Sequence, residues 1–520
     1  IPLPFQQQVA DSASFSKLTL VQAGCGSGKS VAAYLWALNC CKQNEYQCQT
    51  EMNDVNCHPS FSIRLFFCLP TMGTATEQFK DYAMTSGLAA KLSHSKAGID
   101  LERIRSTVTL EEDEFHNIDE LLIHQQDIIE SLELWSSPLV VCTADTVLGL
   151  MVNARRSIYS FPALMNSVMV FDEIHAMDTS MFGHLLMFLK HFPGIPVLLM
   201  TASLSESRKR LLEQVRPDLE VIPGPLEVEQ LPRYLIHYEY KPKNVEEAIR
   251  NTLSTCGKVL WICNQVERAN RCYEDVSERY PGVWVEIYHS RFRYRDRSER
   301  HRKVVDDFQH IKEPMILIAT QVAEMSLDLS ADLLITDLAP IPALIQRLGR
   351  LNRRVTVSHP GTPKPAYISG VDSRYPYEEP EMAVAQQWLS DLEALARPLS
   401  QEDLAQHFAK YEEKEGINLQ EAEKDAIFIS GIWETVVGKV RDAGLTMNII
   451  WEQDLIGFRT ANHKDPDRDW VRNHEIPMQL PKGKIDWKYI LGIPVAPTEN
   501  LNYNYEENTK KGFGASWRQS

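Results

Sequence analysis

The sequence lacks the features that mark secreted and membrane proteins. It has no run of about 18 uninterrupted apolar residues, so no membrane-spanning helix is expected. Its first residues, Ile1-Pro2-Leu3-Pro4, have neither the basic nor the apolar region of a secretory signal, although the missing methionine indicates that a preceding part is absent. Its ten cysteines include no Cys-x-x-Cys pair, which indicates reduced thiols rather than a disulfide framework. We therefore expect a cytoplasmic protein without a membrane partner.

The sequence also lacks an excess of positive charge, and it lacks repeats. Its formal net charge is −16, which argues against a protein that coats nucleic acid along a basic surface but leaves room for a local basic groove. No internal repeat or low-complexity tract is present. At 520 residues the chain exceeds the size that one hydrophobic core usually serves. We therefore expect several globular domains.

What the sequence does contain is a regular alternation of strand and helix patterns. From residue 18 to about residue 223, short apolar runs bounded by turns alternate with helical patterns, which predicts an α/β domain with a parallel sheet covered on both faces. A proline-rich stretch at 221–242 is expected to be a linker, after which the alternation resumes in a second α/β domain. We therefore predict three domains, at 1–225, 226–371 and 372–520.

The third domain differs from the first two. Helical patterns at 381–396 and 402–423 are followed by a terminal stretch rich in Trp, Pro and Asn with weak periodicity, so that only the helices of this domain are predicted. Within the first domain, acidic and apolar residues at helical spacing predict an exposed helical insertion at 111–133. The expected strands are 18–21, 62–69, 139–142, 167–171, 197–200, 257–263, 283–288, 315–319 and 333–336.

The stretch Ala23-Gly24-Cys25-Gly26-Ser27-Gly28-Lys29-Ser30 lies between an expected strand and a helical pattern. This order is typical of a phosphate-binding loop, in which the backbone N–H groups of residues such as Gly26, Ser27 and Gly28 converge on an anion at a helix N-terminus. Lys29 would add a positive charge and Ser30 would ligate Mg²⁺. The alternative is a glycine-rich turn that binds nothing, but the order of features favours binding of a nucleoside triphosphate.

A second acidic motif, Asp172-Glu173-Ile174-His175, follows the expected strand at 167–171. A nucleotide-bound Mg²⁺ needs a carboxylate at the end of a neighbouring strand, and Asp172 would hold the ion there, directly or through water. Glu173 would polarise the attacking water, because phosphoryl transfer depends mainly on positioning and charge compensation. The alternative is an acidic strand end without a catalytic role.

Two further motifs complete the set. Thr201-Ala202-Ser203 follows the strand at 197–200, where hydroxyl groups couple a nucleotide site to nucleic acid in enzymes of this kind. The stretch Gln346-Arg347-Leu348-Gly349-Arg350-Leu351-Asn352-Arg353 places three arginines on about one helical face. A basic helix face is commonly just solvated, but guanidinium groups suit transferring phosphates, and we assign Arg350 and Arg353 as arginine fingers across a cleft between the two α/β domains.

In this order, the four motifs resemble those of a superfamily 2 helicase with a DExH box. The stretches at 288–292, 319–328 and 333–353 further resemble the CRISPR-associated helicase of type I interference systems. The resemblance is good to about residue 370 and weak beyond it. It implies two tandem RecA-like domains that form an ATP cleft, followed by a C-terminal accessory domain.

The resemblance implies an ATP-driven motor that moves 3′ to 5′ on single-stranded DNA. Such a motor is recruited to the displaced strand of an R-loop made by a guide-RNA surveillance complex, in which guide pairing recognises the sequence. By family position, Gln6 would recognise adenine, His175 and Gln346 would contribute to the nucleotide site, and Asp328 would lie near the ribose. The DNA path would be lined by Thr71, Thr143, Thr201, Asn264, Ser290, Arg291 and Thr320.

The sequence departs from the fused form of this family in one respect. That form carries an HD nuclease, in which a His-Asp dipeptide with further histidines and aspartates coordinates metal ions, and no His-Asp dipeptide occurs here. The nuclease is expected either in an absent N-terminal region or in a separate HD subunit, and we favour the separate subunit. The chain alone is not expected to cut DNA.

The stretch 291–303 interleaves arginines with aromatic residues. Such a pattern can stack bases and bind the phosphate backbone, but it also fits a solvated helix start in which Asp296 and Glu299 form local ion pairs.

Two alternative functions also remain open at this point. One is a DExH helicase that acts on RNA or in DNA repair, and the other is a nucleotide-gated scaffold with little turnover.

Overall fold

The computed structural model describes residues 2–14, 16–24, 26–51, 64–83, 90–93, 136–238, 240–325, 327–370, 375–411, 417–429, 446–462, 466–479, 487–506 and 511–518. The chain forms two compact units, each built from two separate parts of the sequence. The first unit is Ile1–Glu229 with Glu412–Asp442, and the second is Gln230–Tyr411 with Ala443–Ser520. The insertion expected at 111–133 lies outside the described residues.

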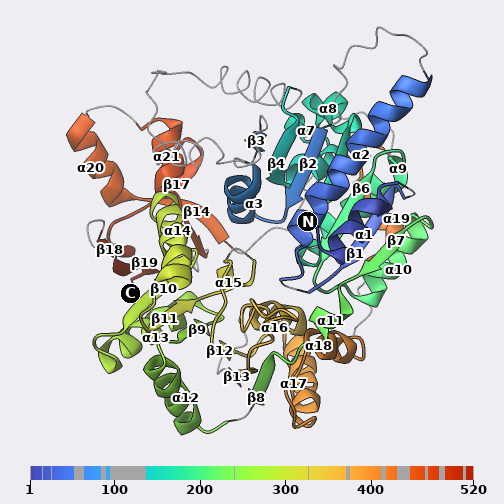
Figure 1. Ribbon diagram of the computed structural model, residues 1–520. Helices are drawn as coiled ribbons and strands as arrows, with labels where there is room; N and C mark the ends of the chain where they lie inside the picture. Colours follow the sequence, from blue (N-terminus) through green and yellow to red (C-terminus); the bar gives the residue numbers. More distant parts are fainter. Residues whose placement is uncertain are drawn as a thin grey trace. The chain divides into compact units, whose positions relative to one another are not determined.

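The first unit contains a parallel sheet in the order β3-β4-β2-β5-β6-β1-β7 (Figure 1). Its strands are β1 (Leu18–Gln22), β2 (Arg64–Leu69), β3 (Ala90–Ser93), β4 (Leu139–Thr143), β5 (Ser167–Phe171), β6 (Val197–Thr201) and β7 (Glu220–Pro223). Alternate residues of one strand enter two different cores: Phe66 packs in one and Phe67 in the other. Both faces of the sheet are therefore covered, which explains the continuous apolar runs in the sequence.

One face of this sheet is covered by α1 (Pro4–Ser12), α2 (Lys29–Glu51) and α3 (Met72–Gln78). The helices that enter the core on the other face include α6 (Ala144–Leu148), α8 (Phe161–Met165), α9 (Thr179–His191) and α10 (Glu206–Val215). The helix α19 (Leu419–Asp425) also joins this core, although almost 200 residues separate it from β7. Its Ala422 lies against Gly183 of α9, and the backbone N–H of Phe428 donates to Met151 O (3.1 Å).

The second unit contains a parallel sheet in the order β10-β11-β9-β12-β13-β8. Its strands are β8 (Tyr234–Tyr238), β9 (Lys258–Ile262), β10 (Trp284–Tyr288), β11 (Met315–Ala319), β12 (Leu333–Asp337) and β13 (Lys364–Ser369). One face is covered by α12 (Pro242–Ser254) and α13 (Val266–Arg279), and the other by α14 (Tyr294–His310), α16 (Ile341–Leu348), α17 (Glu379–Glu393) and α18 (Gln401–Phe408). The fold class is therefore the expected one, with two α/β units of the RecA-like type.

The end of the chain forms a mixed sheet and a hairpin that belong to the second unit. The sheet, in the order β15-β14-β17-β16, pairs β14 antiparallel with β15 and parallel with β17. Its elements are β14 (Thr446–Trp451), α20 (Glu452–Asn462), α21 (Arg468–His474), β15 (Ile476–Gln479), β16 (Tyr489–Ile490), β17 (Ile493–Ala496) and the hairpin strands β18 (Leu501–Glu506) and β19 (Lys511–Trp517).

This terminal region packs on the arginine-rich stretch before and within α14. Arg293 forms an ion pair with Asp454 (2.6 Å), and the Tyr503 hydroxyl donates to Asp296 (2.5 Å). Arg300 is buried, where it pairs with Glu286 (3.1 Å) and donates to Gly512 O (3.0 Å). The expected local pairs of Asp296 are confirmed, with Arg293 and Arg295 (both 3.3 Å), but Arg293, Asp296 and Arg300 are not solvated, since they also hold the terminal region to α14.

Two expectations about elements are wrong. The expected linker at 221–242 does contain the boundary between the two units, after Glu229, but it is not free of regular structure: it includes the end of β7, the helix α11 (Leu226–Glu229) and all of β8, whose residues Tyr234–Tyr238 pair in register with β13. The single helix expected at 402–423 is instead two helices, of which α18 ends at Phe408 and α19 begins after Asn418, whose side chain accepts from Gln420 N (2.9 Å). The helix expected at 381–396 is confirmed as α17.

Among the described helices, none combines the length and the hydropathy that crossing a bilayer requires.

Candidate nucleotide site and its partner motifs

The phosphate loop joins β1 to α2, as the sequence predicts. Gly26 and Gly28 adopt φ angles of 84° and 87°, in the left-handed region that favours glycine. Ser27 is buried and its hydroxyl donates to Gly24 O (2.9 Å), while Ala23 N donates to Thr201 O (3.0 Å). These bonds fix the loop to the end of β6 and direct its backbone toward the N-terminus of α2.

Lys29 and Ser30 begin the helix α2. The Lys29 Nζ atom donates to the carbonyl oxygens of Ala23 (2.5 Å) and Gly24 (3.3 Å), so the ammonium group lies at the loop. The Gly24 N–H donates to the carboxylate of Glu229 (2.7 Å), a partner more than 200 residues away that the sequence did not predict.

Gln6 lies directly against this loop. Its Nε2 atom faces Gly28 O at 3.4 Å, and a methyl group at Gly28 would lie 2.7 Å from the same atom. The Oε1 atom accepts from Leu3 N (2.9 Å), which fixes the side chain at the start of α1. Gln7 instead is exposed and donates to Asp11 (2.7 Å). The structure therefore brings Gln6, and not its neighbour, to the loop.

Asp172 and Glu173 follow β5 at the same end of the sheet. Asp172 is buried, and Glu173 N donates to its Oδ1 atom (2.9 Å). The pKa of Asp172 is raised to about 7, mainly by burial and in addition by the adjacent Glu173 carboxylate, while Lys29 opposes the shift. Glu173 itself has a φ of 52°, an uncommon backbone conformation for a residue with a side chain. This pair is a site for positive charge, which a divalent cation would satisfy.

His175 connects the acidic motif to the Thr-Ala-Ser motif. Its Nδ1 atom lies 3.3 Å from Glu173 Oε2 and 3.0 Å from Thr201 Oγ1. The Thr201 hydroxyl is fully buried and also donates to Ser203 O (2.6 Å). Glu173, His175, Thr201 and Ser203 are therefore connected by one continuous series of polar contacts.

Arg208 contacts the backbone of the turn that carries His175, and the sequence did not predict this role. Its Nη1 atom donates to Met177 O (2.9 Å) and lies 3.4 Å from His175 O, while its guanidinium stacks on Phe182 at 4.7 Å. The side chain is buried on α10. The only signal in the sequence was an arginine in an amphipathic helix, which gives no indication of these backbone partners.

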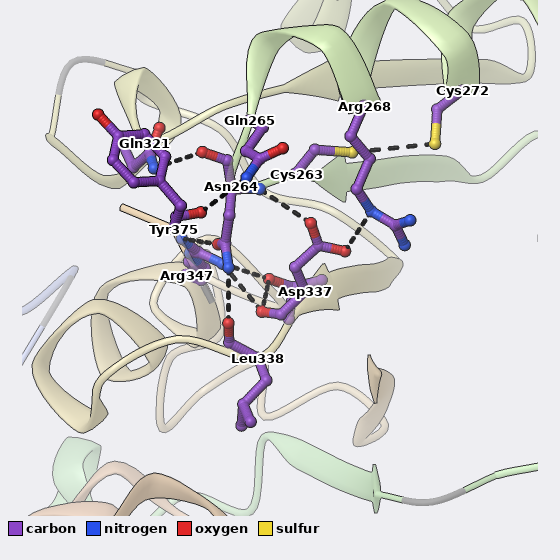
Figure 2. A network of polar contacts seen from close by, with 11 residues as sticks. Cys263, Asn264, Gln265, Arg268, Cys272, Gln321, Asp337, Leu338, Arg347 and Tyr375 are labelled. Carbon is purple, nitrogen blue, oxygen red and sulfur yellow. Dashed lines mark hydrogen bonds and ion pairs between the residues drawn. The ribbon is translucent and has the colours of Figure 1, made fainter. Parts of the chain in front are cut away.

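In the second unit, Asn264 is the centre of a polar network (Figure 2). Its backbone N–H donates to Asp337 (2.9 Å), its side-chain amide donates to Leu338 O (2.7 Å), and its Oδ1 atom accepts from Arg347 (3.0 Å). Gln321 Nε2 donates to the backbone carbonyl of Asn264 (2.8 Å). This residue, predicted to contact DNA, thus links the segments that follow β9, β11 and β12.

Arg347 closes the network from α16. It is fully buried and pairs with Glu324 (2.8 Å), Thr336 Oγ1 (2.8 Å) and the Tyr377 hydroxyl (3.2 Å). Burial raises the pKa of Glu324, and Arg347 partly offsets that shift. Every described bond of Arg347 lies within the second unit. The first arginine of the Gln346–Arg353 motif therefore stabilises the fold of that unit.

The two predicted arginine fingers differ from each other. Arg350 is buried, and its guanidinium donates to the backbone carbonyls of Ala323 (3.0 Å) and Glu324. Arg353 is partly exposed and pairs with Asp328 (3.2 Å), so the structure brings these two predicted residues together. Gln346 is buried, and its Nε2 atom has no hydrogen-bond partner among the described residues.

The residues predicted to contact DNA share one topological position, the carboxyl end of a strand. Because parallel strands end at the same edge of their sheet, each unit gathers its own set at one edge. Thr71 is the N-cap of α3 and accepts from Thr74 N (3.3 Å), while Arg291 is buried and pairs with Glu267. Thr143 and Thr201 are the last residues of β4 and β6, whereas Thr71, Asn264, Ser290 and Thr320 follow β2, β9, β10 and β11.

Comparison with known proteins agrees with this geometry. Residues 3–211 match the family model of the DEAD/DEAH box helicases, and residues 255–356 match that of the CRISPR-associated nuclease/helicase Cas3, C-terminal. The chain is 38% identical to a putative CRISPR-associated nuclease/helicase Cas3 of Myxococcus xanthus over all of this chain and 64% of that protein. It is 26% identical to the CRISPR-associated endonuclease/helicase Cas3 of Escherichia coli over 65% of this chain and 40% of that protein.

The fold is also similar to solved structures. The crystal structure of T. fusca Cas3 with AMPPNP superposes with a TM-score of 0.69 at 19% identity, over 96% of this chain and 68% of that chain. The chain spans 64% of the length of its Myxococcus relative. Motifs, fold and sequence identity together show that the chain is similar to the helicase part of the CRISPR-associated nuclease/helicases called Cas3.

Proposed function

We propose that this chain is an ATP-dependent motor that translocates along single-stranded DNA and unwinds target DNA in a type I CRISPR interference system. The observation that carries the proposal is the gathering of Gln6, Lys29, Asp172 and Glu173 around the phosphate loop of the first unit. Solved structures of T. fusca Cas3 with AMPPNP and with ATP, which share this fold, support ATP as the nucleotide.

In the proposed reaction, the backbone N–H groups of Gly26, Ser27 and Gly28 bind phosphate oxygens, and Lys29 exchanges its carbonyl partners for them. Ser30 and Asp172 are the residues that would hold Mg²⁺. The adjacent carboxylates of the buried Asp172 and the partly exposed Glu173 fit such an ion, because a divalent cation relieves their mutual repulsion. When bound, Mg²⁺ supplies charge neutralisation to the phosphates.

Glu173 orients and deprotonates the water that attacks the γ-phosphate. His175 contacts both Glu173 and Thr201. A change at Glu173 during hydrolysis would therefore alter the hydrogen bonds of His175, Thr201 and Ser203. Gln6 recognises the adenine from the start of α1, a role that its position against the loop supports.

The second unit contributes Gln346, Asp328, Arg350 and Arg353 to hydrolysis. Arg350 and Arg353 stabilise the charge on the transferring phosphate, which requires both side chains to reach a nucleotide held by the first unit. Arg350 would exchange two backbone carbonyls, and Arg353 would exchange Asp328, for phosphate oxygens. Asp328 then lies near the ribose, and the buried Gln346 amide provides a donor close by.

Single-stranded DNA would follow the carboxyl edges of both sheets. Hydroxyl and amide groups there contact the phosphate backbone rather than base edges, which suits a motor that moves 3′ to 5′ on any sequence. The proposed contacts are Thr71, Thr143, Thr201, Asn264, Ser290, Arg291 and Thr320.

The partner in this proposal is a guide-RNA surveillance complex that presents the displaced strand of an R-loop. A solved structure titled CRISPR RNA-guided surveillance complex, pre-nicking, contains a chain with a similar fold (TM-score 0.56), which supports this choice. DNA cleavage would belong to another domain or to a separate HD nuclease subunit. The curated relatives are named nuclease/helicases, and the chain spans only part of their length.

ATP turnover measured with single-stranded DNA, with RNA and without nucleic acid tests the proposal. Strong stimulation by DNA is the expected result. A preference for RNA would support an RNA helicase instead, and negligible turnover under all three conditions would support a nucleotide-gated scaffold.

A further inference from the structure

The second unit carries an open groove that the proposed reaction does not use. The helix α12 packs over β9 and β12, whereas α13 packs over β10 and β11, so the two helices stand apart above β9. The groove between them has a volume of about 480 Å³, within the range of sites that bind ligands. Its floor is formed by Trp261, a half-buried residue of β9.

The middle of the groove is apolar. Val245 and Ile249 of α12 line one wall, and the indole of Trp261 lies between the two helices. An aromatic ring that stays partly accessible between two helices can bury further apolar surface, at about 25 cal/mol per Å². The groove therefore has room and contact area for one aromatic or large aliphatic side chain.

The ends of the groove are basic, in a chain whose net charge is −16. Arg268 uses only its Nε atom on Asp337, and its two terminal nitrogens point away from that carboxylate (Figure 2). Lys243 has no ion pair among the residues that the structure describes, and Arg279 has only an exposed pair with Asp275. These cations face the groove with donors available for carboxylates.

The spacing of these charges distinguishes between a peptide and a nucleic acid as the ligand of the groove. Arg268 and Arg279 are eleven residues apart on α13, which corresponds to about 16 Å along the helix and to about five residues of extended peptide. Between them the groove presents apolar side chains and one carboxylate, Glu246, which pairs with Arg250 (2.5 Å). Nucleic acid would instead need cations at each successive phosphate and no carboxylate among them.

We propose that this groove docks an acidic linear segment of a partner protein. The segment places an aromatic or large aliphatic side chain against Trp261 and its carboxylates on Arg268 at one end and Arg279 at the other, with Lys243 adding charge at the rim. At the Arg268 end the docked segment would lie next to the polar network of the second unit, because Arg268 donates to Asp337 and Asp337 accepts from Asn264 N.

A peptide library displayed on phage, selected on the whole chain, tests the proposal. The expected result is enrichment of sequences with carboxylates about five residues apart around an aromatic or aliphatic residue. The charge-reversal variant Lys243→Glu/Arg279→Glu should bind the enriched peptide at least tenfold more weakly. The control variant Arg210→Glu/Lys312→Glu carries the same charge change on exposed residues outside the groove and should change affinity less than about twofold.

The binding site itself is located by ¹⁹F NMR of chain labelled with 5-fluorotryptophan, in which Trp261→Phe assigns the Trp261 signal. The enriched peptide should shift that signal saturably, and Lys243→Glu/Arg279→Glu should keep its DNA-stimulated ATP turnover. Three results would overturn the proposal: peptides that bind the two double variants equally, an unmoved Trp261 signal, or a shift produced instead by an oligothymidylate at lower concentration than by the peptide.

Discussion

The carboxyl edges of the two sheets hold their charged residues in opposite ways. In the first unit, Asp172 and Glu173 lie side by side, and the pKa of Asp172 is raised because burial and its neighbour both disfavour its charge. In the second unit, the buried carboxylates of Glu324 and Asp337 have guanidinium partners in Arg347 and Arg268.

This difference indicates which of the two sheet edges is suited to bind a ligand. Two adjacent carboxylates whose charges are only partly compensated, by Lys29 and His175, can bind a positive ion, whereas carboxylates paired with guanidinium groups form a rigid frame. We therefore propose that the first edge binds the nucleotide and its metal ion, and that the second edge is the rigid frame from which Arg350 and Arg353 act. Substitutions at the first edge should consequently lower turnover more than stability, and substitutions at the second edge should lower stability more than turnover.

The largest effect on chemistry is expected from Glu173→Gln. Without the carboxylate that orients and deprotonates water, turnover should fall by about 10³-fold or more, while ATP binding persists. Single-turnover hydrolysis and fluorescent-nucleotide binding separate the two quantities. Hydrolysis within tenfold of the wild type would remove Glu173 from the proposed mechanism.

The largest effect on stability is expected from Arg347→Ala. It leaves Glu324 buried without its guanidinium partner, which should lower the free energy of unfolding by about 3–5 kcal/mol. Equilibrium denaturation checks this value, and Arg347→Lys should restore little because one ammonium group cannot replace the several directed bonds of the guanidinium. A loss below about 1 kcal/mol would contradict the frame-like role of the second edge.

Asp172 should make stability depend on pH in the absence of Mg²⁺. Its pKa in the folded chain, about 7, lies above the ordinary aspartate value, so folding favours the protonated form. The stability that this provides is fully present below about pH 4 and is lost as the pH rises through 7, by at most about 1.4 kcal/mol per pH unit. Denaturation from pH 4 to 8 should show this slope in the wild type and a shallower slope in Asp172→Asn. Equal slopes would refute the assignment.

A smaller effect is expected from Thr201→Val, which removes the hydroxyl that links His175 to Ser203 but keeps the side-chain shape. Stimulation of turnover by DNA should fall about tenfold, equivalent to about 1.4 kcal/mol, while basal turnover changes little. Steady-state turnover with and without single-stranded DNA measures both. A proportional loss of the two rates would show that Thr201 does not couple them.

The sequence predicted the parts of the site that depend on local order. A strand, a glycine-rich turn and a helix N-terminus must follow one another for a phosphate loop to form, and the structure has them in that order from Leu18 to Lys29. Asp172 and Glu173 were predicted for the same reason, since they directly follow a buried strand. Periodicity also predicted the central strands of both parallel sheets, but it missed β3 and β7 of the first sheet and β8 and β13 of the second.

The parts that were missed depend on contacts between distant residues. Glu229 reaches Gly24, Arg208 reaches the turn after Asp172, and Asp454 reaches Arg293 across 161 residues. No periodicity carries such information, so the basic stretch at 291–303 gave no sign of its terminal partners. The helix α19 was missed as a part of the first unit for the same reason.

The most direct test of the central claim is ATP turnover by Lys29→Ala with single-stranded DNA present, measured beside its free energy of unfolding. Lys29 bonds two loop carbonyls and no carboxylate among the described residues, so its loss should cost about 1 kcal/mol of stability. The account predicts that DNA-stimulated turnover is abolished in a chain that remains folded. Turnover retained by the folded variant would contradict the assignment of the first edge as the ATP site.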